Sequence, residues 1–310
     1  TGIVTAAGTS VFTNLDISGD IDVDGTTNLD VVDIDGAVDM ASTLVVGGVV
    51  NLSTGSESSP ALFFNSDSDT GIYSGGSNTV VITAGGSNRF YADASTHLGT
   101  LTAGTSNLAL GVNAGNSIES GGNYNVLVGD EAGTAITTGD YNVFVGFVAG
   151  DATTTGRENI AMGGYSLGSN TTGTNNTAVG SGSLQSNTTA DNNTSVGYNS
   201  LAANTTGDRN VAMGGLALDA NTTADGNTAF GYDSLSTNTG SELNVAIGFN
   251  ALRLYNNGSG SGYNTAVGAL AGAAVTTGTQ NTLIGGLAGD AITTASYNTA
   301  VGYGSLTANT

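Results

Sequence analysis

A five-residue pattern, Asn-x-x-apolar-Gly, recurs twelve times between residues 107 and 302 and limits what this chain can fold into. Successive copies begin 17 residues apart, except for one spacing of 18 and one of 20. A fixed period of this length is typical of repeat architectures, in which each unit packs only against its neighbours. Seventeen residues accommodate short strands and tight turns but no helix of useful length. We therefore predict an all-β array, a parallel β-roll or solenoid of about twelve 17-residue coils over residues 99–310.

Two columns follow from stacking one repeat on the next. The leading asparagine is predicted to form a ladder of side-chain amides, because an amide both donates and accepts hydrogen bonds. The ladder comprises Asn107, Asn125, Asn142, Asn159, Asn176, Asn193, Asn210, Asn227, Asn244, Asn264, Asn281 and Asn298. The fourth residue of the pattern is always apolar, and we predict that it forms a core column. This column comprises Leu110, Val128, Val145, Met162, Val179, Val196, Met213, Phe230, Ile247, Val267, Ile284 and Val301.

The glycine that ends each pattern predicts a backbone with positive φ or a close backbone approach. A second regularity concerns side-chain volume. Eight residues after the asparagine the chain has Leu or Gly, and the residue three positions later changes with it: Leu201 is followed by Asn204, whereas Gly133 is followed by Ile136. We interpret the two positions as filling the same part of the coil interior, as close packing requires. Gly150 with Thr153, and Leu252 with Tyr255, are imperfect cases.

Composition excludes several classes of function. The formal net charge is −21, with 25 acidic residues against four arginines and no lysine. Binding to nucleic acid or to an anionic membrane surface requires clustered cations, so neither is expected. The chain has no cysteine, hence neither disulfides nor thiolate metal sites, and no apolar run long enough for a transmembrane helix. Because it begins without Met at Thr1 and stops in mid-repeat at Thr310, we expect a piece of a longer polypeptide.

The first hundred residues differ from the repeats. In residues 1–58, Ile17, Ile21 and Val23 alternate with acidic residues, which predicts an acidic β shaft that several chains intertwine to stabilise. Residues 59–98 contain short apolar runs between Ser-, Asp-, Asn- and Gly-rich loops, which predicts a small β module.

These segments resemble known families. Repeats such as Asn193-Thr-Ser-Val-Gly-Tyr-Asn-Ser-Leu-Ala-Ala-Asn-Thr-Thr-Gly207 resemble the head repeats of trimeric autotransporter adhesins, and still more those of bacteriophage tail fibres. The stretch from Pro60 to Tyr73 resembles a module of marine and cyanobacterial phage fibres, and the acidic run resembles the shaft that precedes it. The resemblance implies an elongated homotrimer, a left-handed β-roll and a role in host attachment. One departure is the period, which is usually shorter than 17 residues in adhesin heads.

No pattern of catalytic or metal-binding residues emerges. Asp20-x-Asp22-x-Asp24-Gly25 begins like a calcium loop, but Val31 stands where a bidentate acid is needed, so a solvated strand face is the simpler interpretation. His97 is the only histidine, which leaves no histidine-based triad or metal cluster. The acidic residues of the repeats are scattered without a recurring pair. We expect no catalytic residue, no cofactor and no bound metal.

Other motifs have simple explanations in the repeat itself. The Asn-Thr-Thr segments at Asn170, Asn187, Asn204 and Asn221 are glycosylation sequons, and their paired threonines predict an exposed hydroxyl ladder. Both features follow from the repetition of the Asn-Thr-Thr sequence, although glycosylation of the asparagines and ice binding by the threonines stay open. The longest repeat contains an insertion that predicts a flexible loop, with Asn256, Asn257 and Ser259 as an exposed contact point.

We therefore expect a structural and adhesive segment of a phage tail fibre, located in the virion, which extends and presents host-receptor-binding regions. Its partners would be two further copies of the chain, other virion tail proteins, and a host surface glycan or protein bound mainly by other regions. One alternative is a bacterial trimeric surface adhesin or extracellular filament. A second is a monomeric ice- or glycan-binding solenoid.

Overall fold

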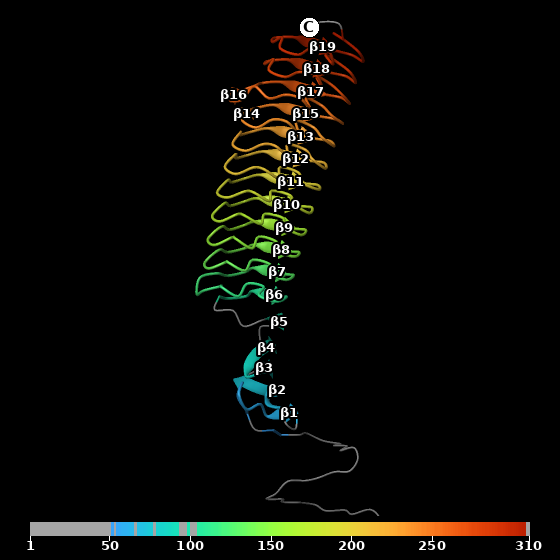
Figure 1. Cartoon of the computed structure of the whole chain (residues 1–310). Helices are drawn as coiled ribbons and strands as arrows, with labels where there is room; N and C mark the ends of the chain where they lie inside the picture. Colours follow the sequence, from blue (N-terminus) through green and yellow to red (C-terminus); the bar gives the residue numbers. More distant parts are fainter. Residues whose placement is uncertain are drawn as a thin grey trace, which may run out of the picture. The chain divides into compact units, whose positions relative to one another are not determined.

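The computed structural model of this chain describes residues 51–52, 54–64, 67–76, 79–92, 98–99 and 104–307 (Figure 1). Their regular secondary structure is entirely β, with no helix among the described residues. The acidic shaft segment up to residue 50, including the calcium-loop motif, and His97 lie outside the described residues.

A small antiparallel sheet contains the predicted β module. Its strands follow one another in chain order. They are β1 (Leu62–Phe64), β2 (Asp67–Gly76), β3 (Thr79–Ala84), β4 (Ser87–Ala92) and β5 (Leu98–Gly99). Residues 54–58, which the sequence assigned to the shaft, are bonded to this sheet: Ser74 N donates to Thr54 O at 2.9 Å and Thr83 Oγ1 donates to Glu57 O at 3.0 Å.

The repeats form a parallel β-solenoid with one principal strand per coil (Figure 1). Twelve three-residue strands pair in register, so that Ala178 lies opposite Ser195 in the next coil. They are β6 (Leu108–Leu110), β7 (Val126–Val128), β8 (Val143–Val145), β9 (Ile160–Met162), β10 (Thr177–Val179), β11 (Thr194–Val196), β12 (Val211–Met213), β13 (Thr228–Phe230), β15 (Val245–Ile247), β17 (Thr265–Val267), β18 (Thr282–Ile284) and β19 (Thr299–Val301). Two short strands, β14 (Ser241–Glu242) and β16 (Gly260–Ser261), pair beside them.

The asparagine ladder runs through the buried interior of the solenoid. The backbone N–H of each asparagine donates to the Oδ1 of the asparagine one coil earlier, without a break across the coils of 18 and 20 residues. The amide Nδ2 also reaches across its own coil, as from Asn193 to Gly207 O at 2.9 Å. Most of these side chains thus join two coils and also bond the far turn of their own coil; Asn244 and Asn298 instead donate to carbonyls two or three residues before them.

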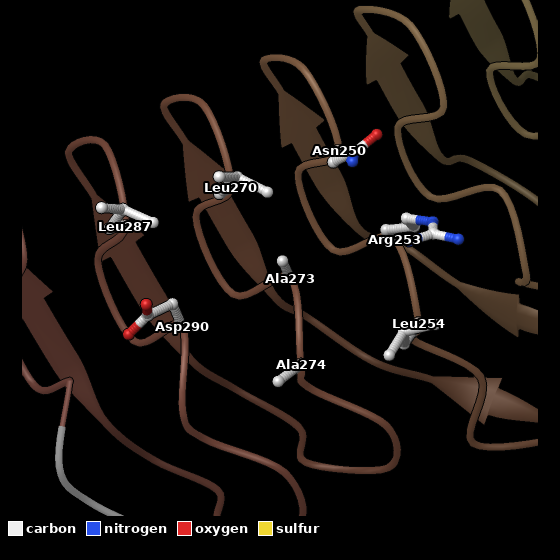
Figure 2. Close-up of a pocket in the computed structure, with 8 residues that line it drawn as sticks. All are labelled: Asn250, Arg253, Leu254, Leu270, Ala273, Ala274, Leu287 and Asp290. Carbon is white, nitrogen blue, oxygen red and sulfur yellow. The ribbon is translucent and has the colours of Figure 1, made fainter.

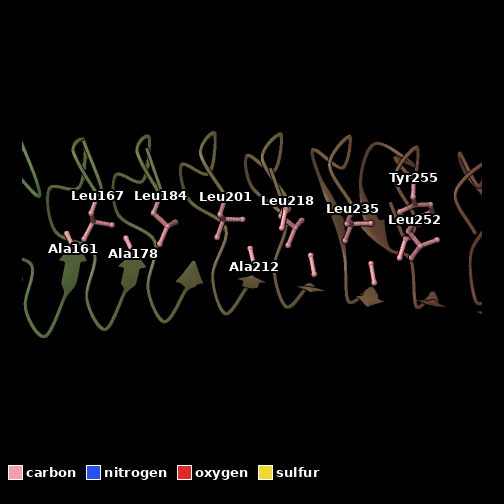
Figure 3. Packing of buried hydrophobic residues seen from close by; sticks show 14 of the residues in the cluster. Ala161, Leu167, Ala178, Leu184, Leu201, Ala212, Leu218, Leu235, Leu252 and Tyr255 are labelled. Atoms are coloured by element: carbon pink, nitrogen blue, oxygen red, sulfur yellow. The ribbon is translucent and has the colours of Figure 1, made fainter. Parts of the chain in front are cut away.

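The hydrophobic core uses the middle residue of each strand and the residue eight positions after the asparagine. Where the latter is Leu, as in Leu184, the middle residue is Ala or Ser, and both columns are buried (Figure 3). Where it is Gly, a Leu or Phe from the middle of a strand fills the space. A Cβ atom added to Gly133 would stand 2.8 Å from Leu127 Cδ2 and 2.8 Å from Ile136 Cδ1. The predicted volume exchange is therefore present, with the strand's middle residue as a third member.

The two imperfect repeats have physical explanations. In the first, the Phe144 ring occupies the place where a side chain of Gly150 would stand, so Thr153 need not be a larger aliphatic residue. In the second, Tyr255 is fully buried together with Leu252, and its hydroxyl reaches the place where a Cβ of Gly262 would stand. The three-residue insertion that precedes Asn264 thus accompanies an oversized core residue.

The apolar fourth position of the repeat does not form the core column that the sequence predicted. These residues are the third of each strand and point away from the interior, because strand side chains alternate and the middle residue is the buried one. Phe230 is 51% exposed and Met162 is 44% exposed, whereas Ala229 and Ala161 beside them are 0% exposed. The column is a surface feature.

The glycine that follows each strand has a positive φ, and all of these glycines except the last, Gly302, also closely approach the backbone of the next coil. At Gly180 the φ angle is +129°, a conformation that favours glycine. A Cβ atom there would stand 2.5 Å from the carbonyl oxygen of Gly197 in the next coil. The coils stack closely at this corner because no side chain separates them.

Candidate functional site

The outward-pointing residues of the solenoid strands form one continuous surface, which we call the strand face. It consists of the first and third residues of β6 to β13, β15 and β17 to β19. The third residues are the apolar column described above, and the first residues are Val, Thr, Ile or Leu. Parallel in-register pairing aligns them from coil to coil. The result is a largely aliphatic sheet surface that no other described segment buries.

Aromatic residues border the strand face on both sides. Two residues after the strand come Phe147, Tyr198, Tyr232, Phe249 and Tyr303, and two residues before it come Tyr124, Tyr141, Tyr263 and Tyr297. The rings of Tyr124 and Tyr141 stack with centroids 4.9 Å apart, and those of Tyr232 and Phe249 stack at 6.1 Å. All nine of these side chains are exposed.

Exposed apolar side chains are concentrated on this surface. Within residues 104–307, every exposed large hydrophobic side chain lies on the strand face or at these two borders, apart from Tyr165 and Leu254. Single exposed apolar residues are ordinary on protein surfaces, but a contiguous patch marks an interaction site.

Charged residues have the opposite distribution. No residue of the twelve principal strands is charged, and the only charged residues at the two borders are Asp130, Glu158 and Arg209. The other acids of the repeats lie in the turns, apart from Glu242 in β14; Asp208 and Asp225 accept backbone N–H groups of the preceding coil, and Asp225 binds Arg209 Nη2 at 2.8 Å. The strand face is therefore uncharged, although the chain as a whole has a net charge of −21.

The strand face is large enough for a stable protein–protein interface. Twelve strands at a spacing of roughly 4.8 Å give a length of about 50 Å, and with its borders the face is about 20 Å wide. An area on the order of 1,000 Å² compares with the ~800 Å² per partner of a standard interface.

The predicted contact loop is tied to the solenoid. Asn257 N donates to Ser241 Oγ at 3.0 Å, and Asn256 Oδ1 accepts a hydrogen bond from Thr239 Oγ1 at 3.2 Å. Gly260 and Ser261, further along the insertion, form β16. Asn256 and Asn257 are half-buried and only Ser259 is exposed, so the insertion is an ordered side extension of the coil.

A hollow of about 310 Å³ lies where small residues interrupt the coil surface (Figure 2). Ala273 and Ala274 form its centre, with Arg253 and Asp290 at opposite ends. Arg253 Nε is already bound to Asp233 Oδ2 at 2.8 Å. The polar groups that line the hollow do not converge on one point, so the hollow has no arrangement for orienting a small ligand.

Two carboxyl groups of the turns have perturbed titration. Burial raises the pKa of Asp151, and burial followed by repulsion from Asp233 raises the pKa of Asp219. Asp219 Oδ1 is buried without a hydrogen-bond partner. Asp151 and Asp219 lie four coils apart and cannot act as a pair.

The sequon asparagines are interior residues. Asn170, Asn187, Asn204 and Asn221 are fully buried and, with Asn238, form a second amide ladder, in which Asn204 Nδ2 donates to Asn187 Oδ1 at 3.0 Å. They are not available for glycosylation in the folded chain. The first threonine of each pair donates its hydroxyl to a carbonyl of the next coil, as Thr188 does to Thr205 O at 3.0 Å. Only the second threonine, such as Thr189, is exposed.

Within the part of the chain that the structure describes, no three acidic, histidine or cysteine residues are grouped so as to hold a metal ion. The described segments also contain no helix capable of spanning a membrane. Comparisons with protein-family models, curated proteins and solved structures found no match to this chain. The strand face is therefore the surface on which a functional proposal depends.

Proposed function

We propose that this chain is a segment of a phage tail fibre, in which three copies associate through their strand faces into a homotrimer. The segment extends the fibre and presents regions that bind a host receptor, and the solenoids are left-handed β-rolls. Stiffness comes from stacked hydrogen-bonded coils, and weak receptor contacts are multiplied because several copies are held together.

The observation that carries this proposal is the segregation of apolar and charged side chains. A monomeric protein with a net charge of −21 has many acidic side chains with which to cover a sheet, yet none lies on the strand face. An uncharged surface of this size can meet an identical copy, because no acidic side chain of either copy lies within the contact itself. The sequence resemblance to trimeric fibres supports three copies.

A charge placed on the strand face tests the assembly. We expect Val179→Asp to dissociate the trimer, because burying three carboxylates against one another is strongly unfavourable. Thr189→Asp, in an exposed turn, is the matched control and should leave the assembly intact. Sedimentation velocity gives the mass, and circular dichroism shows whether the variant retains its β structure. A folded Val179→Asp variant that keeps the mass of the assembly would contradict the proposed interface.

Immunogold labelling of the sample from which this sequence comes tests the biological role. Gold-labelled antibodies raised against this chain should decorate fibres that project from phage tails. Label on bacterial surfaces instead would favour the trimeric adhesin, which has the same structural requirements. Label on neither structure, although the chain is expressed, would contradict a fibre role.

A further inference from the structure

The small antiparallel sheet has its own unpartnered apolar side. Leu62, Ile72 and Ile82 lie directly opposite one another on β1, β2 and β3, and therefore point to the same side of the sheet. They are 56%, 41% and 42% exposed. Val80 lies two residues before Ile82, points to the same side and is also exposed. We call these four residues the module row.

The other side of this sheet is covered by the chain itself. Val81 is 3% exposed and Thr83 is 0% exposed, although they alternate with the module row along β3. Residues 54–61 account for this burial: Thr83 Oγ1 donates to Glu57 O, and Pro60 is buried. The centre of this side is thus buried, although Phe63 at the edge strand β1 is 53% exposed, whereas no described residue covers the module row.

We propose that the module row is a second self-association surface, which contacts the same four residues of the other copies in the assembly. This inference rests on the proposed function, since it requires copies that are already joined through their strand faces. It extends the assembly from the repeats into a sheet that shares neither their period nor their strand pairing.

The size of the row indicates why a further copy is the occupant. Four half-exposed aliphatic side chains present roughly 300 Å² of apolar surface, well below the ~800 Å² per partner of a stable interface. An independent partner would be held too weakly by so small a surface. A copy joined along the solenoid needs no additional affinity, because its module is already present at high local concentration.

The chemistry of the row agrees with self-contact. Leu, Ile and Val carry no hydrogen-bonding groups, so identical rows can meet without leaving a polar atom unsatisfied. The assembly would bury on each chain both the strand face and the module row.

Cysteine cross-linking of the full chain tests the module row directly, because the natural sequence has no cysteine. Ile72→Cys places a thiol in the row, and Ser58→Cys places one in the exposed turn on the covered side of the sheet. Val179→Cys reports separately on the strand face. Each purified variant is oxidised with copper–phenanthroline and separated on a non-reducing denaturing gel. A disulfide forms only if two Cα atoms come within about 7 Å, so the readout is local.

We expect Ile72→Cys and Val179→Cys to form linked chain pairs, leaving one chain of each trimer unlinked, and Ser58→Cys to remain unlinked. Linkage at Val179→Cys without linkage at Ile72→Cys would overturn the module-row proposal and leave the proposed fibre standing. Absence of linkage at both, together with the mass of one chain, would overturn both proposals. If the thiol introduced by Ile72→Cys is neither linked nor accessible to maleimide, something other than the same row of another copy covers it, which also overturns the inference.

Discussion

Asparagine at the start of each repeat is the residue that most directly connects this sequence to its fold. Its Oδ1 accepts the backbone N–H of the next coil, and its Nδ2 donates across its own coil. The sequence predicted a ladder, because a side chain repeated at one period must stack on itself. It did not predict the bond across the coil, which depends on where the turn at Gly207 and its equivalents returns. It also missed the second ladder, because Asn-Thr-Thr is a common turn sequence.

Removing one amide from the first ladder should be costly. We expect Asn193→Ala to lower the free energy of unfolding by about 2–4 kcal/mol, because the N–H of Asn210 loses its partner inside the solenoid and Gly207 O loses one of its two amide donors. Thr206→Ala, at an exposed turn position, is the control and should change stability by less than about 0.5 kcal/mol. Urea unfolding followed by circular dichroism measures both, and equal effects would contradict a structural role for the ladder.

The Asp219 carboxyl should make stability depend on pH. Burial raises its pKa in the folded chain above the unfolded value of about 3.9, so the folded state favours the protonated form. The folded chain therefore has its full stability at pH below this unfolded value, where Asp219 is protonated in both states, and it loses part of that stability as pH rises through the folded pKa.

We expect Asp219→Asn to stabilise the chain at neutral pH by about 0.5–1 kcal/mol, a gain limited by the partial exposure of the group. The gain should disappear near pH 3. Asp225→Asn, which removes the ion pair with Arg209, should not stabilise at neutral pH. Thermal unfolding between pH 3 and 8 measures the difference, and a gain that grows toward low pH would contradict the sign.

At the scale of one coil, three positions share a fixed interior volume. The sequence revealed two of them because Leu with Asn, and Gly with Ile, alternate visibly along the chain. The third, the middle of the strand, gives no such signal in the sequence because it is most often Ala. The larger neighbouring residue was instead predicted to be the core, although alternation along a strand places it outside. A single sequence cannot decide which of two alternating columns is buried when the interior is too narrow for large side chains.

A double-mutant cycle tests this shared volume. We expect Leu218→Gly to destabilise the chain by about 3 kcal/mol through the cavity it leaves. Ala212→Leu alone should also destabilise, because it overpacks the coil against Leu218. The double variant reproduces the arrangement of Leu127 with Gly133 and should recover about 1–3 kcal/mol relative to the sum of the two changes. Additive effects in urea unfolding would contradict the exchange.

For the whole molecule, the strand face shows where a solenoid with few aromatic residues places its large apolar side chains. The interior of the solenoid is narrow and filled largely by Ala, Leu and Asn, while its Met, Phe and Tyr side chains, apart from Phe144 and Tyr255, lie outside. Periodicity predicted the coils but not this inversion, which appears only when burial is known residue by residue. Association of copies would turn the exposed side chains into the core of the assembly.

The solution mass of the full chain, measured by size-exclusion chromatography with light scattering, tests this account most directly. We predict a mass three times that of the 30.3 kDa chain, unchanged on dilution into the nanomolar range. A stable, folded species with the mass of a single chain would contradict the account, and would leave the strand face to some other partner.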